Sequence, residues 1–391
     1  MHILIKIGLV SLLVISGLAF WMVEPYYNIP VLKPNLPPIE SAHFSECDFS
    51  SNGIERKVQE RLSEHLNAHS LLGASIGFYT PECGTYVASG GFRSKRELKP
   101  FSTDTVTRIA SITKPMTAIA IMQLHESGAV DIDDPIQSYL NDFPITEVPV
   151  TIRHILNHTS GIPHYKSALD AMSFSYYEDL QTAAEAVYER GFVDTAGKRY
   201  IYTSFGYTVL GRIVEIVSGQ DFATYLNREI WQPAGMSKTS LESTVDPAKK
   251  SRLYLRLFGK FIRSPYTDLS LIYPAGGVQS TAQDLLSFGA AVLDNRLVTD
   301  TTLREMADTS ASLALVAGDD PYGLGWSVTE HPDFGTIMAH GGSQPGVSAQ
   351  FLVLVDQEIV AVALSNAYGT KGSVIDLAYF MAGLALDTKG H

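Results

Sequence analysis

A hydroxyl and an amine stand three residues apart at Ser111 and Lys114, just before an apolar run from Met116 to Leu124. Residues with this spacing lie one turn apart on the same face of a helix. Because the run is apolar on nearly every side, it predicts a buried helix, which Ser127-Gly128 would end. The N-terminal end of a helix also offers unpaired backbone N–H groups and a partial positive charge, which favour a developing oxyanion.

Spacing alone leaves two interpretations of this stretch open. In the first, Ser111 is a nucleophile whose proton is taken by a neighbouring base. Lys114 can be that base only when it is neutral. At pH 7 this needs a lysine pKa about three units below normal, a free-energy cost of ~4 kcal/mol for the charged form. Burial and a cationic neighbour can supply such a shift. In the second, Ser111 caps the helix and Lys114 is a solvated surface residue.

The composition is that of a large globular protein. The chain has 391 residues, of which 45% are apolar and 18% are charged, enough for one large fold or two joined subdomains. Its formal net charge of −12 argues against nucleic acid as a partner, because that binding depends on Lys and Arg neutralising phosphates. His154 and His158 have helical i, i+4 spacing, but a structural role is favoured over zinc. We expect no metal ion and no organic cofactor.

Residues 1–25 are predicted to be an uncleaved signal-anchor helix in a membrane. After Lys6, the run from Ile7 to Val23 is uncharged and mostly apolar, and it spans roughly 25 Å at 1.5 Å per residue, within the range of membrane-spanning helices. Tyr26 and Tyr27 follow where aromatic residues gather at a membrane surface. Because the positive end stays in the cytoplasm, we expect the main domain to be extracytoplasmic, in the periplasm or outside the cell.

A Pro-rich linker at residues 26–50 is predicted to join this anchor to a domain at residues 51–391. The segment PVLKPNLPP at 30–38 favours an extended spacer. The chain has only two cysteines, Cys47 in the linker and Cys83 in a turn between two strand-like runs. An even pair in an exported protein suggests a disulfide, and two free thiols are the alternative.

Strand-like runs occur near both ends of the domain, and the segment from about 131 to 264 is mostly helical and loop. This order predicts one sheet built from both ends of the domain, with a helical insertion. Ser280 and Gln283 together make a capping box at the start of a helix. The expected strands are 74–79, 84–89, 325–329, 336–340, 350–355 and 359–365, and the expected helices are 53–72, 116–124, 209–217 and 373–386.

Three motifs in order carry a resemblance to a known family: Ser111-Ile112-Thr113-Lys114, Tyr202-Thr203-Ser204 and His340-Gly341-Gly342-Ser343. With the cluster Asn157–Pro163 they resemble the class C β-lactamase and D-Ala-D-Ala peptidase (penicillin-binding) family of serine hydrolases. The stretches 202–207 and 264–288 are most similar to its LACTB-like branch. The resemblance covers about residues 53–385. It implies an α+β fold, with an antiparallel sheet flanked by helices and an inserted, mostly helical subdomain.

The resemblance also implies the chemistry of the site. Ser111 would form a covalent acyl-enzyme, and either Lys114 or Tyr202 would be the base that accepts its proton. Tyr202 resembles the residue that activates water for deacylation. Such a site implies acyl transfer to water without a cofactor.

On the substrate side, the resemblance implies an oxyanion hole made by the backbone N–H groups of Ser111 and Ser343, where Gly342 allows close approach. Two positions that face the substrate in the family depart from its pattern: Ser204 replaces the Asn of Tyr-x-Asn, and His340 replaces the Lys of Lys-Thr-Gly. A histidine with a pKa near 6.5 is mostly neutral at pH 7, so the site lacks a fixed cation for a carboxylate. Both changes weaken the case for penicillins and leave acyl transfer intact.

Each motif also has a structural interpretation. Tyr202 can be one packed aromatic residue among several, and His340 a hydrogen-bonded histidine at a strand end. The cluster Asn157–Pro163 is interpreted as the junction of a turn and a helix rather than as a substrate contact.

The expected function is that of a serine hydrolase that cleaves an amide or an ester in a small-molecule or peptide substrate. True β-lactamase activity is the less favoured form of this reaction. The alternative is a non-turnover binding or sensor module for cell-wall peptides or β-lactams. Tyr202 favours the enzyme, because a pure binder needs no deacylation base. The sequence leaves the oligomeric state open.

Overall fold

The main sheet is built from both ends of the domain. The computed structural model describes residues 35–44, 47–49, 53–167, 170–242 and 250–389. Among them an eight-stranded sheet has the order β1-β3-β2-β13-β12-β11-β10, with β4 beside β3, and all its pairs are antiparallel. Its strands are β1 (Glu40–Phe44), β2 (Gly73–Thr80), β3 (Gly84–Ser94), β4 (Lys99–Pro100), β10 (Ser327–His331), β11 (Gly335–Gln344), β12 (Val347–Leu354) and β13 (Ile359–Ser365).

The pairing of β2 with β13 joins the two ends of the chain within this sheet. Val360 pairs with Tyr79, and Ser365 pairs with Ala74. Every residue of β13 is buried. Because helices cover both faces of this strand, its sequence is apolar almost throughout instead of alternating between apolar and polar.

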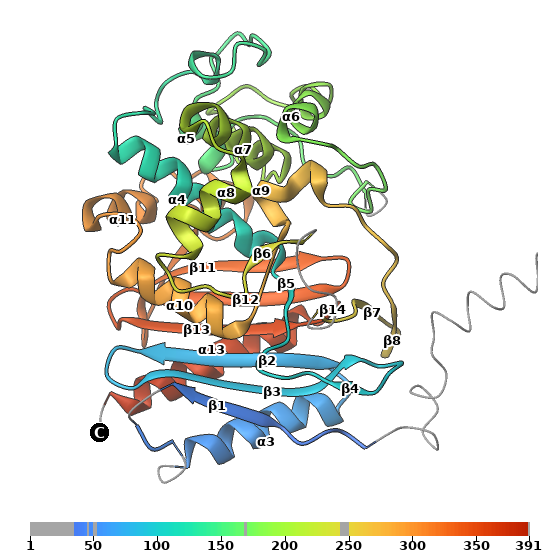
Figure 1. Ribbon diagram of the computed structural model, residues 1–391. Coiled ribbons are helices and arrows are strands. Elements are labelled where there is room, and N and C mark those ends of the chain that lie inside the picture. The colour runs from blue at the N-terminus through green and yellow to red at the C-terminus, as the bar shows by residue number, and fades with distance from the viewer. Residues whose placement is uncertain (1–34, 45–46, 50–52, 168–169, 243–249, 390–391) are drawn as a thin grey trace, which may run out of the picture.

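Helices cover both faces of the sheet (Figure 1). On one face lie α3 (Ile54–Asn67) and α13 (Lys371–Thr388), whose buried side chains cluster with Ala361 of β13. On the other face α10 (Ala282–Leu293) packs against Val360 and Val362 of the same strand. Alternate residues of one strand therefore face two different helical layers.

The other half of the molecule is mainly helical and is centred on α4 (Thr113–Glu126). Nearly every residue of α4 is buried, and the helix packs against α7 (Phe205–Ser218) and α9 (Tyr273–Gly276). It ends at Glu126, two residues before Gly128, whose φ is 73°. Other helices are η2 (Ala110–Ile112), η3 (Ile136–Ser138), α5 (Ile152–Leu156), α6 (Leu180–Tyr188), α8 (Phe222–Leu226), η4 (Asn227–Trp231), η6 (Ser270–Ile272), α11 (Asp300–Ala307) and α12 (Ala314–Ala317).

Two three-stranded sheets connect these halves. One has the order β5-β9-β6 and leads the chain into η2, and the other has the order β14-β7-β8. Their strands are β5 (Thr107–Arg108), β6 (Ser240–Leu241), β7 (Tyr254–Leu257), β8 (Lys260–Arg263), β9 (Val278–Ser280) and β14 (Ala367–Tyr368). The segment 131–264 consists mainly of helices and loops, and it also contains the three short strands β6, β7 and β8.

Two local expectations differ from the structure. Residues 40–44, expected to belong to the linker, form β1, which pairs with β3 at the edge of the main sheet. Thr281, not Ser280, caps α10, because its hydroxyl accepts a hydrogen bond from the N–H of Asp284 at 3.1 Å. The Ser280 hydroxyl instead lies 2.8 Å from the Thr239 hydroxyl.

The predicted membrane anchor at residues 1–25 lies outside the described residues, and so does the linker up to residue 34. Within the described ranges, no helix combines the length and the apolar character needed to cross a membrane.

A disulfide joins Cys47 to Cys83, and the two residues are 36 apart in the sequence. The bond ties the segment before α3 to the turn between β2 and β3. Because it restricts the unfolded chain, closing a loop of this size contributes roughly 3–4 kcal/mol in the chain-entropy model.

Replacing both cysteines, in Cys47→Ser/Cys83→Ser, is therefore expected to lower the free energy of unfolding by roughly 3–4 kcal/mol. Urea denaturation followed by circular dichroism measures this loss. Reduced wild-type protein is the matched control and should unfold at the same urea concentration as the double variant. A double variant as stable as the oxidised protein would contradict a stabilising role for the bond.

Candidate active site

The turn before α4 directs Ser111 into a cavity. Ser111 lies in η2, which runs directly into α4. The approach to η2 is fixed by β5 and by the N–H of Ile109, which donates to the carbonyl of Val278 at 3.1 Å. Ala110 has a φ of 50°, a left-handed conformation that costs a non-glycine residue about 1–3 kcal/mol. The half-buried Ser111 side chain lines the cavity and does not cap the helix.

Lys114 lies one turn further along and is fully buried. Its Nζ lies within hydrogen-bond distance of Ser111 Oγ at 3.1 Å, of Ser204 Oγ at 3.2 Å and of the carbonyl oxygen of Ala275 at 3.2 Å. Burial lowers the pKa of Lys114 to about 7. A neutral amine has a lone pair that can accept the Ser111 proton. The interpretation of these two residues as a helix cap and a solvated lysine is therefore wrong.

Tyr202 packs against the same amine. Lys114 Nζ lies 4.8 Å from the centroid of the Tyr202 ring. Burial raises the pKa of Tyr202, and its hydrogen bond with Ser111 offsets part of that rise. At neutral pH the Tyr202 phenol therefore keeps its proton. Of the two candidate bases that the sequence leaves open, Lys114 is the one able to accept a proton in the resting site.

His158 holds the segment that carries Tyr202. It lies in the turn after α5, and its backbone has a φ of 62°. The N–H of Ile201 donates to the His158 carbonyl at 2.7 Å, and the N–H of Thr203 donates to its Nδ1 at 3.2 Å. The ring centroid of His158 lies 4.3 Å from that of Tyr202. Both backbone neighbours of Tyr202 are thus fixed by one buried histidine, within the junction of turn and helix expected at 157–163.

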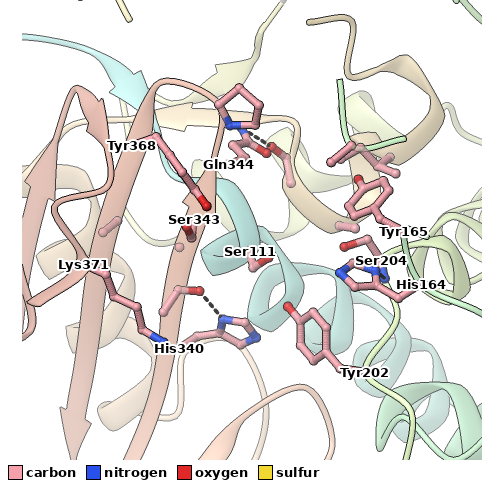
Figure 2. A pocket seen from close by; sticks show the side chains of 18 of the residues that line it. Ser111, His164, Tyr165, Tyr202, Ser204, His340, Ser343, Gln344, Tyr368 and Lys371 are labelled. Atoms are coloured by element: carbon pink, nitrogen blue, oxygen red, sulfur yellow. Dashed lines mark hydrogen bonds between the residues drawn. The ribbon is translucent and has the colours of Figure 1, made fainter. Parts of the chain in front are cut away.

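The opposite wall of the cavity is β11 (Figure 2). His340 donates from Nδ1 to the Gly341 carbonyl at 2.8 Å, and its Nε2 accepts a hydrogen bond from the Tyr322 hydroxyl at 3.0 Å. Burial, with a smaller effect from charged Lys114, lowers the pKa of His340 to about 3. His340 is therefore an uncharged, doubly hydrogen-bonded residue in the middle of β11, and its expected place at a strand end is wrong because the strand continues to Gln344. The pKa near 6.5 expected from the sequence is wrong because it ignored burial.

Gly342 lets β11 lie against the turn that carries Ser111. A Cβ at this position would be 2.3 Å from the carbonyl oxygen of Ile109. Ser343 follows it with an exposed side chain and lines the cavity across from Ser111 (Figure 2). The backbone N–H of Ser111 lies in the first turn of a helix, where such groups have no intrahelical acceptor. These are the two segments expected to supply an oxyanion hole.

The cavity between these walls has a volume of about 630 Å³, in the range of small-molecule and peptide sites. It contains the expected residues Ser111, Tyr202, Ser204, His340 and Ser343, and Gly342 also lines it. Lys114 lies beneath its floor and reaches it through Ser111 and Ser204.

Sequence reasoning missed several residues of this cavity, among them His164 and Tyr322. His164 directly follows the cluster 157–163, so its position next to a noted motif was an available signal. Tyr322 belongs to no motif and reaches His340 only through the tertiary fold.

A serine and a buried amine at the start of a central helix, facing an antiparallel sheet, define a serine hydrolase of the β-lactamase and penicillin-binding type. The chain belongs to the Beta-lactamase family, whose family model matches residues 56–386.

Similar proteins include penicillin-binding protein 4* of Bacillus subtilis, 28% identical over 72% of this chain. This chain spans 65% of the length of that relative. The bovine mitochondrial serine β-lactamase-like protein LACTB is 24% identical over 90% of this chain and 79% of its own length. Among solved structures, a penicillin-binding protein from Bacillus halodurans superposes with a TM-score of 0.70 at 26% identity, covering 81% of this chain and 98% of that one.

The rate at which Ser111 reacts with a fluorophosphonate probe is expected to rise with pH through about 7 and then level off. The labelling rate should rise with pH, and not fall, because only the neutral form of Lys114 accepts the Ser111 proton. His164 and His340 stay uncharged throughout this range, since burial lowers their pKa values to about 4 and about 3. Labelling rates measured from about pH 5.5 to about pH 9 test this expectation.

Ser111→Ala is the control for labelling elsewhere on the protein, and Lys114→Met should lose the rise with pH. A wild-type rate that stays constant with pH, in protein shown to be folded at each pH by circular dichroism, would exclude Lys114 as the base.

Proposed function

We propose that this protein is a membrane-anchored, extracytoplasmic serine hydrolase that cleaves an amide or an ester through an acyl-enzyme on Ser111. The observation that carries the proposal is the Lys114 amine, 3.1 Å from Ser111 Oγ and fully buried. Among the described residues, no carboxylate lies within ion-pair distance of it. Burying an amine without a counter-ion costs free energy, whereas a neutral amine beside a hydroxyl activates a nucleophile.

In the acylation step, neutral Lys114 takes the Ser111 proton while Oγ attacks the substrate carbonyl carbon. Backbone N–H groups of Ser111 and Ser343 stabilise the oxyanion. When the intermediate collapses, the C–N or C–O bond breaks and the leaving amine or alcohol receives the proton from Lys114, directly or through the Tyr202 phenol.

In the deacylation step, a water molecule replaces the leaving group. It gives a proton to Lys114 through the Tyr202 phenol as its oxygen attacks the acyl carbon. Collapse of this second intermediate returns the proton to Ser111 Oγ and releases the acid. Tyr202 is suited to this relay because its phenol points toward Ser111 (Figure 2) while its ring packs on Lys114.

The cavity supports small-molecule or peptide substrates, and it supports esters and peptides better than penicillins. Its volume of about 630 Å³ accommodates either class. His340 is uncharged and both of its ring nitrogens are engaged, so β11 itself offers no fixed cation for a penicillin carboxylate. The lysine that lines the cavity is Lys371, at the start of α13 (Figure 2). Ser204 is likewise occupied by Lys114.

Ser111→Ala is expected to abolish turnover of activated esters, and Tyr202→Phe to slow it by about 100-fold or more, the usual contribution of an acid–base group. Steady-state hydrolysis of p-nitrophenyl esters measures both effects, with unfolding midpoints as the control for folding. Wild-type activity in Ser111→Ala would exclude the acyl-enzyme. A burst of one equivalent without further turnover in the wild type would favour the non-turnover binding module.

The proposed location rests on the anchor expected at residues 1–25. Protease added to intact cells or spheroplasts that express the full chain should digest the domain, while a cytoplasmic marker protein stays intact. A domain that is digested only after lysis would overturn this part of the proposal and leave the chemistry unaffected.

A further inference from the structure

We propose that the Nε2–H group of His164 donates a hydrogen bond to the substrate, and that it selects acyl groups carrying a carbonyl oxygen a few atoms from the scissile bond. The inference rests on the proposed function, because it concerns the acyl group that Ser111 would receive. His164 lines the cavity on the side of Tyr202 and Ser204, across from β11 (Figure 2).

A backbone contact fixes which nitrogen of His164 carries the proton. The N–H of Ser204 donates to Nδ1 of His164 at 3.3 Å. A backbone N–H can only donate, so Nδ1 must present its lone pair. In an uncharged imidazole the proton then resides on Nε2, which becomes the donor.

His164 is uncharged at neutral pH. Burial and, to a smaller extent, Lys114 lower the pKa of His164 to about 4, while Asp170 acts in the opposite direction. In the charged form of His164 both ring nitrogens carry a proton, so the Nδ1–H group would face the Ser204 N–H and the hydrogen bond between them would be lost. The contact with Ser204 therefore favours the same uncharged tautomer that burial favours.

The Nε2–H group is available to a ligand. The side chain is half-buried, and in the described part of the chain no group accepts a hydrogen bond from Nε2. The ring is also held in place, with centroids of Tyr165 and Tyr202 at 4.5 and 5.4 Å. A donor held by its neighbours loses little freedom when a ligand binds.

Two other polar side chains at the same cavity, those of His340 and Ser204, are already engaged. His340 uses both ring nitrogens, one with Gly341 and one with Tyr322. The Ser204 hydroxyl accepts from Lys114 at 3.2 Å. Of the two histidines that line the cavity, only His164 therefore presents an N–H to a substrate.

The chemistry of this donor defines the acyl groups that it selects. An uncharged N–H binds a hydrogen-bond acceptor and has no attraction for an ammonium group. A carbonyl oxygen of an N-acyl or peptidyl group fits, whereas a simple fatty acyl group leaves the donor unpaired. A desolvated donor left without a partner lowers the affinity for the transition state.

The experiment compares p-nitrophenyl esters of N-acetylglycine and of pentanoic acid, which have chains of equal length with and without the amide. The p-nitrophenyl ester of 4-oxopentanoic acid keeps the carbonyl and lacks the amide N–H. Each kcat/KM is divided by the rate of the same ester with hydroxide. Wild type should prefer the N-acetylglycine and 4-oxopentanoate esters over the pentanoate ester by about tenfold.

Two variants separate donation to the substrate from support of Ser204. His164→Asn can place an oxygen near Nδ1 to accept from Ser204 but has no donor at the Nε2 position. His164→Gln can place an N–H near Nε2 but lacks the acceptor for Ser204. We expect His164→Asn to lose the tenfold preference, and His164→Gln to keep the preference even where all rates fall.

An unchanged preference in His164→Asn would overturn the inference, and a preference lost only in His164→Gln would assign His164 to supporting Ser204. Should neither variant fold, the absence of a preference in the wild type would still overturn the inference.

If the wild type hydrolyses none of the esters and Ser111 is not labelled by fluorophosphonate, the proposed function fails as well. Wild-type turnover without selectivity removes only the role of His164.

Discussion

Desolvation of the Lys114 amine determines what the rest of the site has to do. A pKa of about 7 in place of 10.5 means that burial disfavours the charged form by roughly 5 kcal/mol. A nearby carboxylate would cancel this effect, and in the described structure the amine contacts two hydroxyls and one carbonyl instead. Aromatic rings complete the enclosure, with Tyr202 and Tyr207 centroids at 4.8 and 5.5 Å from Nζ. The site is therefore a small set of dipoles around a neutral base.

Enclosing that amine requires the two halves of the molecule to meet closely. The helical half supplies α4 and the Tyr202 segment, and the sheet supplies β11. Gly342 permits their contact, because a side chain there would collide with the carbonyl of Ile109. Ala110, directly before Ser111, and His158, which packs against Tyr202, hold left-handed backbone conformations. Each costs free energy locally, and the doubly covered sheet provides the stable framework that maintains them.

Periodicity and motif order could predict the framework but not the electrostatics of the site. β13 was found at its expected bounds because a strand covered on both faces reads as one apolar run. β1 was not predicted, because it follows a Pro-rich segment and forms only by pairing with the edge strand β3 in the folded protein. Ser111, Lys114 and Tyr202 converge as the resemblance implied. The pKa of His340 could not be predicted, because it depends on burial and on Lys114, far away in the sequence.

The two cavity histidines show why residue type is a poor guide to the polarity of a site. His340 donates from Nδ1 because a carbonyl, that of Gly341, lies beside it. His164 accepts at Nδ1 because an N–H, that of Ser204, lies beside it. The neighbouring backbone group therefore sets which nitrogen faces the ligand as a donor. With both rings uncharged and both nitrogens of His340 engaged, neither histidine offers a positive charge to a ligand, and only His164 has an N–H left for a neutral hydrogen bond.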